Sequence, residues 1–251
     1  MKALIPAAGH GTRFLPVTRV VPKEMLPIGA KPAIQLIVEE ALAAGADEVV
    51  VVTSPEKGIL RRYFEGDPGL ASRVRWAMQE EQLGLGHAVL QAAPLLEGER
   101  EPVLVLLGDA LVAGESPSAA MAEISRRHGG ASVVGLEEVP LERVSRYGIV
   151  KGEACEGEDG RVYALSDLVE KPAPEEAPSR LAVAGRYLLD PAVFGLLATQ
   201  APGAGGEVQL TDAIRRLLAE RPVFGYRYPG RRQDIGNPAG YLKALNEFAH
   251  V

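Results

Sequence analysis

Residues 2–14 read Lys-Ala-Leu-Ile-Pro-Ala-Ala-Gly-His-Gly-Thr-Arg-Phe, an apolar stretch followed at once by a glycine-rich turn. The apolar part, Ala3 to Ile5, has the composition of a buried β-strand. Gly9 and Gly11 let backbone N–H groups approach an anion closely, and Arg13 adds a planar set of donors. This order of strand, glycine turn and cation predicts an α/β fold with a phosphate-binding loop after its first strand.

The charge around this loop differs in sign from that of the whole chain. Residues 1–31 contain five lysines and arginines and a single acidic residue, Glu24, which gives a local side-chain charge of +4. The full 251 residues carry 27 basic and 33 acidic side chains, a formal charge of −6. An acidic chain is not expected to bind nucleic acid generically, so the basic segment favours a small phosphorylated ligand.

Two familiar phosphate-binding motifs do not fit these residues. A dinucleotide-binding fingerprint requires a third glycine or alanine where this chain has Phe14, and it requires a helix where this chain has Pro16, Pro22, Pro27 and Pro32. A Walker A loop requires Gly-Lys-Ser/Thr, which is absent here. On this short segment alone, a purely structural turn remains the alternative to a phosphate loop.

The rest of the chain alternates β-type and helical patterns, which predicts a mostly parallel mixed sheet flanked by helices. Strands are expected at residues 3–5, 49–53, 74–78, 103–107 and 131–136, with shorter ones at 148–150, 162–169 and 181–189. Helices are expected at residues 33–44, 55–64, 85–95 and 117–128.

Composition narrows the class of protein further. Hydrophobic residues make up 47% and charged residues 24% of the chain, as in ordinary globular domains. The single cysteine, Cys155, cannot form an internal disulfide, and we expect it to be an exposed thiol. No apolar run approaches the roughly 20 residues of a membrane-spanning helix, and no signal peptide is recognisable. We therefore predict a cytoplasmic protein that does not bind membranes.

A carboxylate follows one of the predicted buried strands. Asp109 comes just after residues 103–107, at the edge of the sheet where open α/β folds bind their ligands. Carboxylate oxygens suit a Mg²⁺ ion that bridges phosphates. An aspartate that merely opens the loop after the strand is the alternative.

A longer pattern connects these features. Gly-His-Gly-Thr-Arg at residues 9–13, then Pro16, then Pro-Lys-Glu-Met-Leu-Pro at 22–27, resembles the signature of the sugar-1-phosphate nucleotidylyltransferases. Later segments resemble most the bacterial UTP–glucose-1-phosphate uridylyltransferases of that family: residues 84–88, 147–148, 169–172, 184–187 and 206–214. The resemblance covers essentially the whole chain.

The resemblance implies a Rossmann-like nucleotidyltransferase fold in a single domain, residues 1–251, with a nucleotide-binding half to about 138 and a sugar-binding half from about 139. It implies Mg²⁺-assisted transfer of UMP from UTP to glucose 1-phosphate, giving UDP-glucose and pyrophosphate, and it allows a homo-oligomer. The alternatives are the same chemistry with dTTP or another sugar 1-phosphate, or a catalytically silent nucleotide-sugar-binding regulator.

The resemblance also assigns roles to individual residues. The catalytic residues would be Arg13, Lys23, Asp109 and Lys171, and the metal ligands Asp109 and Asp234. The nucleotide would be bound by Ala8, Gly9, Gly11, Thr12, Arg13, Lys23, Gln79, Gly84 and Asp109. The sugar phosphate would be bound by Gly148, Glu170, Lys171 and Gly185.

Some of these assignments have competitors in the sequence. Gln79 has the family's spacing to Gly84 for a base-reading glutamine, and Gln82 is the competing residue. Arg186, Glu207 and Asp212 are weaker site candidates. The chain also departs from the family at Ala110, where a second metal-contacting residue sometimes stands, and in the short segment between residues 64 and 79, which puts the oligomer geometry in doubt.

Overall fold

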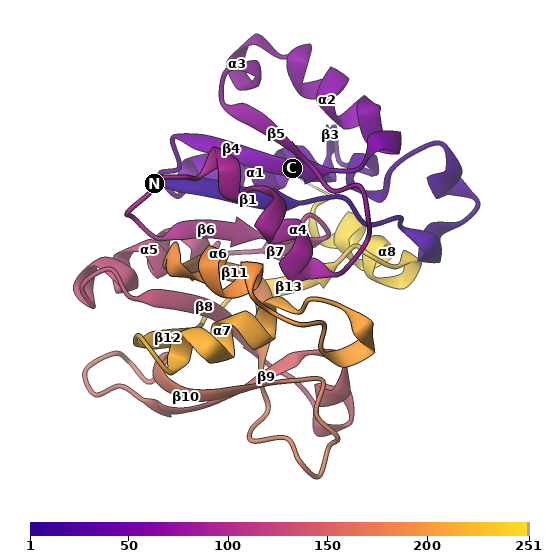
Figure 1. The fold of residues 1–251 in the computed structure, drawn as a ribbon. Coiled ribbons are helices and arrows are strands. Elements are labelled where there is room, and N and C mark those ends of the chain that lie inside the picture. The colour runs from indigo at the N-terminus through magenta and orange to yellow at the C-terminus, as the bar shows by residue number, and fades with distance from the viewer. Residues whose placement is uncertain (250–251) are drawn as a thin grey trace.

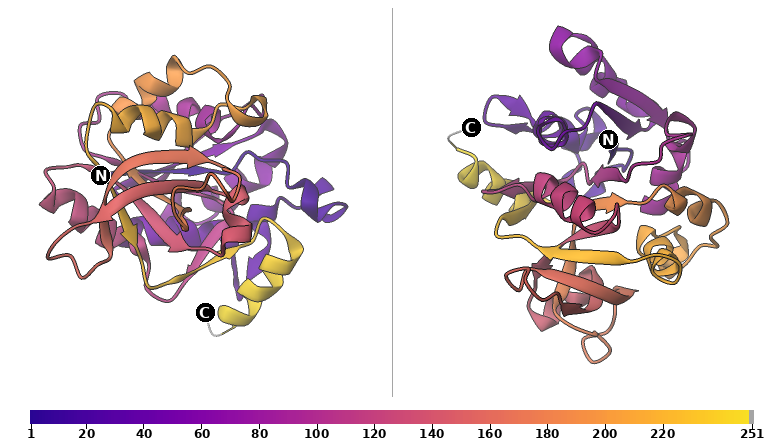
Figure 2. Two further views of the ribbon diagram at one scale, coloured as in Figure 1. Left: turned by 90° about the horizontal axis from the view of Figure 1, so that it is seen from below. Right: turned by 90° about the vertical axis from the view of Figure 1, so that its left-hand side faces the viewer.

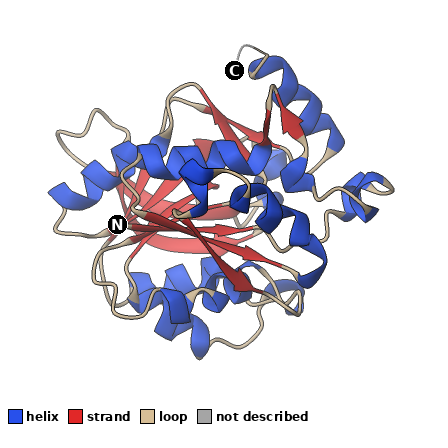
Figure 3. Cartoon of the chain, turned by 90° about the horizontal axis from the view of Figure 1, so that it is seen from above, coloured by secondary structure: helices blue, strands red, loops and turns tan. Residues whose placement is uncertain are grey.

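A computed structural model describes residues 1–249 and is built on a mixed β-sheet with helices on both faces (Figures 1 and 3). The strands of the sheet are, in spatial order, β5 (Val74–Met78), β4 (Glu48–Thr53), β1 (Lys2–Pro6), β6 (Val103–Leu106), β11 (Leu181–Leu189), β8 (Ser132–Glu138), β12 (Val223–Arg227), β10 (Val162–Glu170) and β9 (Gly148–Ala154). The predicted fold class, a mixed α/β sheet flanked by helices, is confirmed.

Strand direction divides the sheet into two parts. β5, β4, β1 and β6 all pair in parallel, as the continuously apolar runs predict. Beyond them, β11 is antiparallel to both β6 and β8, and β10 is antiparallel to both β12 and β9. The pair of β12 with β8 is parallel. Figures 1 and 2 show these parts at opposite ends of one sheet; in Figure 1, β5 lies near the top and β9 and β10 lie near the bottom.

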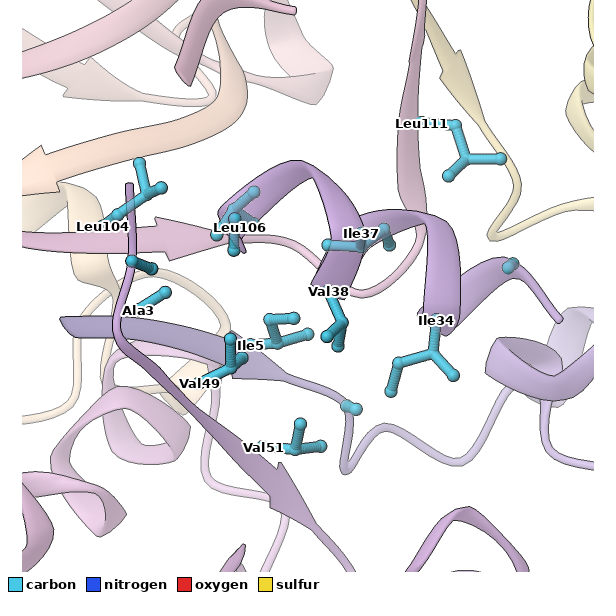
Figure 4. Close-up of a cluster of buried hydrophobic side chains, with 14 of the residues drawn as sticks. Ala3, Ile5, Ile34, Ile37, Val38, Val49, Val51, Leu104, Leu106 and Leu111 are labelled. Carbon is cyan, nitrogen blue, oxygen red and sulfur yellow. The ribbon is translucent and has the colours of Figure 1, made fainter. Parts of the chain in front are cut away.

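Successive side chains of the central strands pack alternately into two hydrophobic cores. Ala3 and Ile5 of β1 face one core, and Leu4 between them faces the other. The first core packs against α1 (Ala33–Ala43), α2 (Gly58–Glu65) and α5 (Pro117–Arg127), and the second against α4 (Leu85–Gln91), α6 (Ala192–Ala198) and α7 (Leu210–Leu218). Figure 4 shows the first core, where Ile34, Ile37 and Val38 of α1 lie over the strands.

Three local predictions differ from the structure. The helix expected at 55–64 is a 3₁₀ turn, η4 (Pro55–Lys57), followed by α2, and a short helix, α3 (Pro68–Ala71), comes next. The helix expected at 85–95 ends at Gln91 and continues as the 3₁₀ turn η5 (Ala93–Leu95), because Pro94 lacks an N–H and disfavours α geometry in the residue before it. Cys155 is half-buried against the first core rather than an exposed thiol.

A small ribbon outside the main sheet brings the end of the chain to β6. β7 (Ala110–Ala113) pairs antiparallel with β13 (Arg231–Asp234), so that Asp234 lies opposite Ala110. The final helix, α8 (Pro238–Glu247), packs on this ribbon and is capped by Asn237, whose Oδ1 accepts a hydrogen bond from the Gly240 N–H at 2.9 Å. A second ribbon joins β2 (Pro27–Ile28) and β3 (Lys31–Pro32). No helix within residues 1–249 is long and apolar enough to cross a bilayer.

A buried ion pair ties α1 to β11. The Arg186 side chain is fully buried, and its Nε and Nη2 donate to the two carboxylate oxygens of Glu40 at 2.9 and 2.7 Å. Ser116 and Ser118 donate to Glu40 as well, at 2.9 and 2.5 Å. Arg186 is therefore an internal cross-link and not the ligand-binding residue that its position in the sequence suggests.

Replacing Arg186 by Met should destabilise the fold strongly, because it leaves the Glu40 carboxylate buried without its cation. We expect a loss of about 3–5 kcal/mol in the free energy of unfolding, measured by denaturant titration. Arg61→Ala is the control: Arg61 pairs with Glu65 on the exposed face of α2, where loss of the pair costs roughly 0.5 kcal/mol or less. Equal losses in the two variants would contradict the internal role of Arg186.

Candidate active site

A cavity of about 540 Å³ opens at the carboxyl ends of β1 and β6. We call it the nucleotide cavity, because it is lined by all nine residues to which the family resemblance assigns nucleotide binding: Ala8, Gly9, Gly11, Thr12, Arg13, Lys23, Gln79, Gly84 and Asp109. Glu207, a weaker candidate, also lines it. Segments up to about 200 residues apart in sequence thus meet at the edge of the sheet where α/β folds bind ligands.

Two glycines that line the cavity, one in the glycine loop and one before α4 (Leu85–Gln91), have backbone geometry that favours glycine. Gly11 has φ 66°, in the left-handed region, and its carbonyl accepts a hydrogen bond from the Thr18 hydroxyl at 2.9 Å. Gly84 has φ 106°, and a Cβ there would lie 2.8 Å from the Val208 carbonyl oxygen. These glycines let two segments of main chain approach the cavity closely.

Lys23 and Asp109, which both line the cavity, form an ion pair. The Lys23 Nζ lies 2.6 Å from Asp109 Oδ2. Burial by itself would raise the pKa of Asp109, but the Lys23 ammonium and its hydrogen bond outweigh burial and hold that pKa below its ordinary value. Burial would likewise lower the pKa of Lys23, but the carboxylates of Asp109 and Glu24 raise it above its ordinary value. Both groups are therefore charged at neutral pH.

Asp234 reaches the same place from the β7–β13 ribbon. The Ile235 N–H donates to the Asp109 carbonyl at 2.9 Å, and the Gly236 N–H donates to Asp234 Oδ1 at 2.9 Å. A Cβ built on Gly236 would lie 2.9 Å from Asp109 Oδ2 and 3.0 Å from Asp234 Oδ1. The two carboxylates predicted as metal ligands thus converge on one glycine.

The chemistry of this donor set suits Mg²⁺. Carboxylate oxygens are hard ligands, and Mg²⁺ is commonly held by one or two carboxylates, with phosphates and water completing its shell. Within residues 1–249 no cluster of three or more His, Cys, Asp or Glu side chains could hold a metal ion by itself. Asp109 and Asp234 would therefore hold the ion together with a phosphorylated ligand, as an open site requires.

Both candidate base-reading glutamines line the cavity, but their amides differ in state. Gln79 is buried, and its Nε2 donates to the Gly84 carbonyl at 3.3 Å and contacts His87 Nδ1 at 3.0 Å. The Nε2 of Gln82 is buried without a hydrogen-bond partner in the described structure. A buried unpaired amide is costly, whereas the Gln79 amide is already paired, so the two glutamines differ in hydrogen bonding and both stay candidates for reading the base.

The predicted sugar-binding residues surround a separate part of the sheet. Glu170 ends β10 opposite Gly148, and its Oε2 accepts a hydrogen bond from the Thr211 hydroxyl at 2.7 Å. Lys171 turns back at φ 47°, so that its Nζ lies 3.3 Å from Glu170 Oε1. Thr211, which the sequence alone did not single out, completes this group on α7.

The two remaining sugar-side candidates have different surroundings. Gly185, at φ 76°, packs against the segment after β6: a Cβ there would lie 3.1 Å from Leu107 Cδ1 and 3.3 Å from Ala110 Cβ. Asp212 is only partly buried and lies beside Gly203, since a Cβ built on Gly203 would come within 2.4 Å of Asp212 Oδ2. Burial and the Glu170 carboxylate both raise the pKa of Asp212. Neither residue lines the nucleotide cavity.

A second cavity, of about 850 Å³, adjoins the first at Arg13 and extends past Asp234 to Lys171. Six basic side chains line it, against a single acidic one: Arg13, Arg143, Arg146, Lys171, Arg232 and Lys243 against Asp234. Its charge suits anionic groups. Arg13 and Lys171, the predicted phosphate contacts, thus share one basic cavity with Asp234, a predicted metal ligand.

Comparison with known proteins decides the family. A family model described as nucleotidyl transferase matches residues 2–250. The chain belongs to this family. The UTP–glucose-1-phosphate uridylyltransferase of Staphylococcus haemolyticus is 42% identical over 269 aligned positions, covering 99% of this chain and 92% of the relative. A similarly named protein of Bacillus subtilis is 42% identical, covering 98% of this chain and 88% of the relative.

Solved structures of the family agree with the fold. A crystal structure of a UDP-glucose pyrophosphorylase complexed with UDP-glucose superimposes with a TM-score of 0.90 at 40% identity, covering 99% of this chain and 98% of that one. A UTP-bound enzyme of the same kind from Acinetobacter baumannii gives a TM-score of 0.82 at 35% identity, covering 98% and 92%. The nucleotidyltransferase fold extends over the whole described chain.

The two glutamines can be separated by substitution. Gln79→Ala should weaken binding of the nucleoside triphosphate and relax the preference among UTP, dTTP and CTP, because an amide supplies the donors and acceptors of a pyrimidine edge. Gln82→Ala is the matched control. The kcat/KM ratios for the three triphosphates measure the effect; an unchanged preference in Gln79→Ala with an altered one in Gln82→Ala would assign base reading to Gln82.

Proposed function

We propose that this protein transfers UMP from UTP to glucose 1-phosphate and releases pyrophosphate, forming UDP-glucose. The observation that carries the proposal is the Lys23–Asp109 ion pair in the cavity that all nine expected nucleotide-binding residues line, with the Asp234 carboxylate beside it across Gly236. Relatives named as uridylyltransferases, and similar structures holding UDP-glucose or UTP, support this choice of substrates.

The reaction requires no nucleophile from the protein. A phosphate oxygen of glucose 1-phosphate attacks the α-phosphorus of UTP in line, a new P–O bond forms, and the bond from the α-phosphorus to the β-phosphate oxygen breaks as pyrophosphate leaves. Two anions must approach each other, so the protein contributes mainly alignment and charge neutralisation.

The residues divide this work between the two substrates. Lys23 and Arg13 would neutralise the triphosphate, and the main chain of the glycine loop would hold it in place. Lys171 would bind the phosphate of the sugar, and Glu170 would accept hydrogen bonds from sugar hydroxyls beside Gly148. Asp109 and Asp234 would hold Mg²⁺, which when bound neutralises phosphate charge. We further propose that the protein acts in the cytoplasm, where its single unpaired cysteine, Cys155, stays reduced.

The first test crosses UTP, dTTP, CTP, ATP and GTP with the 1-phosphates of glucose, galactose, mannose and N-acetylglucosamine, and measures pyrophosphate release with Mg²⁺. We expect UTP with glucose 1-phosphate to dominate, and EDTA to abolish the signal. Another dominant pair would change the substrates but keep the chemistry. If the folded protein binds UDP-glucose but releases no pyrophosphate with any pair, the protein is a nucleotide-sugar-binding protein without catalytic activity.

Substitution of the central ion pair should separate chemistry from folding. Lys23→Ala and Asp109→Ala should each lower kcat by two or more orders of magnitude, because each removes charge stabilisation of the transition state. Their far-ultraviolet circular dichroism should match the wild type. Lys2→Ala is the control, since Lys2 lies at the opposite end of β1; a variant of Lys23 that is active or unfolded would contradict this role.

A further inference from the structure

Lys57, at the end of η4, is a buried lysine that lies beneath the glycine loop. Its side chain is 7% exposed, and its Nζ contacts four oxygens: the carbonyls of Ala7 and Gly9 at 2.7 and 2.6 Å, and both carboxylate oxygens of Glu24 at 2.9 Å. It does not line the nucleotide cavity. Because Glu24 neutralises its charge, Lys57 is unsuited to binding phosphate directly.

The contacts of Lys57 fix the direction of two peptide groups. In a trans peptide the C=O and the following N–H point in opposite directions. When the carbonyls of Ala7 and Gly9 point at the Lys57 ammonium, the N–H groups of Ala8 and His10 therefore point away from it. Ala8 and His10 both line the nucleotide cavity, and in the described structure neither N–H has an acceptor within the protein.

The same ammonium also holds the segment that carries Lys23. Glu24 is 1% exposed and follows Lys23 directly in the 3₁₀ turn η3 (Lys23–Met25). A Cβ built on Gly9 would lie 4.0 Å from the Lys23 Nζ, so the Lys23 ammonium sits beside the loop that Lys57 braces. One buried lysine thus links the glycine loop to the turn that presents the central cation of the site.

We propose that Lys57, with Glu24, is a positioning residue for the nucleotide: it orients the free N–H groups of the glycine loop and seats Lys23 against that loop. The inference rests on the proposed function, since UTP is the ligand concerned. A merely structural ion pair would stabilise the fold without favouring one substrate over the other. A positioning pair affects UTP and leaves glucose 1-phosphate unaffected.

The test uses the double variant Lys57→Met with Glu24→Gln, which removes both charges and leaves no buried ion unpaired. We expect the dissociation constant for UTP, measured by isothermal titration, to rise about ten- to a hundredfold, because a loop that is no longer held presents its donors poorly. The KM for glucose 1-phosphate should stay within twofold of the wild type. UTP affinity within twofold, or equal weakening for both substrates, overturns the proposal.

A matched control removes a similar pair far from the site. Lys2 and Glu48 form a partly buried ion pair of 3.0 Å at the other end of β1 and β4. The double variant Lys2→Met with Glu48→Gln should bind UTP as the wild type does. Titration measures binding without turnover, so failure of the proposed reaction, seen as no pyrophosphate release by the wild type, is distinguishable from failure of this inference.

If the double variant does not fold, Lys57→Ala decides the question by rescue. n-Propylammonium reproduces the atoms that Lys57→Ala removes beyond Cβ, including the N–H donors. We expect it to restore UTP affinity severalfold, and we expect tetramethylammonium, which has no N–H, to have no effect. Equal responses to the two cations would overturn the positioning role.

Discussion

The close approach of β6 to β1 at their carboxyl ends is the contact on which the site depends. The Gly108 N–H donates to the Pro6 carbonyl at 3.2 Å, and a Cβ on Gly108 would lie 2.8 Å from that oxygen. Because glycine allows this approach, Asp109 leaves its strand within reach of the glycine loop and of Lys23. A bulkier residue at 108 would separate the carboxylate from the cation it faces.

The basic side chains around this contact fall into two classes. Buried cations that hold the structure have carboxylate partners: Lys57 pairs with Glu24, Arg186 with Glu40, and Arg232 with Glu137 while it also stacks on Tyr147 at 4.8 Å. Burial of these charges is tolerated because each is paired and hydrogen-bonded. Arg13 and the half-exposed Lys171, which also contacts Glu170, instead border the open cavities, where phosphate groups would pair with them. A chain with a formal net charge of −6 can thus have a positively charged site.

The sequence could predict what is local and what is continuously apolar. The parallel strands β1, β4, β5 and β6 follow from buried runs, and the glycine loop and Asp109 follow from their positions after strands. Helix ends were less predictable, since Pro94 splits one predicted helix. The β7–β13 ribbon was not predicted, because its two strands lie about 120 residues apart in the sequence and their pairing leaves no local pattern.

The residues of the candidate site also divide into those that a local sequence pattern predicts and those that it does not. Asp234 could be assigned only through the family resemblance, since nothing in its own segment places it beside Asp109. Lys57 and Thr211 were missed for a related reason: each acts on a partner more than 30 residues away, Glu24 and Glu170 respectively. Arg186, a weaker site candidate in the sequence, is internal because it is fully buried beside Glu40, a partner 146 residues away that no local pattern indicates.

Arg186 and its neighbour Gly185 also join β11 to the segment that follows β6. Its Nη2 donates to the Ala110 carbonyl at 2.7 Å, immediately after Asp109, and its neighbour Gly185 accepts a hydrogen bond from the Leu107 N–H at 3.0 Å. β11, which carries Gly185 and Arg186, is therefore joined to the segment between β6 and β7 from both sides of Asp109. Because these bonds hold β11 on both sides of Asp109, a shift of β11 relative to β6 would also move that carboxylate.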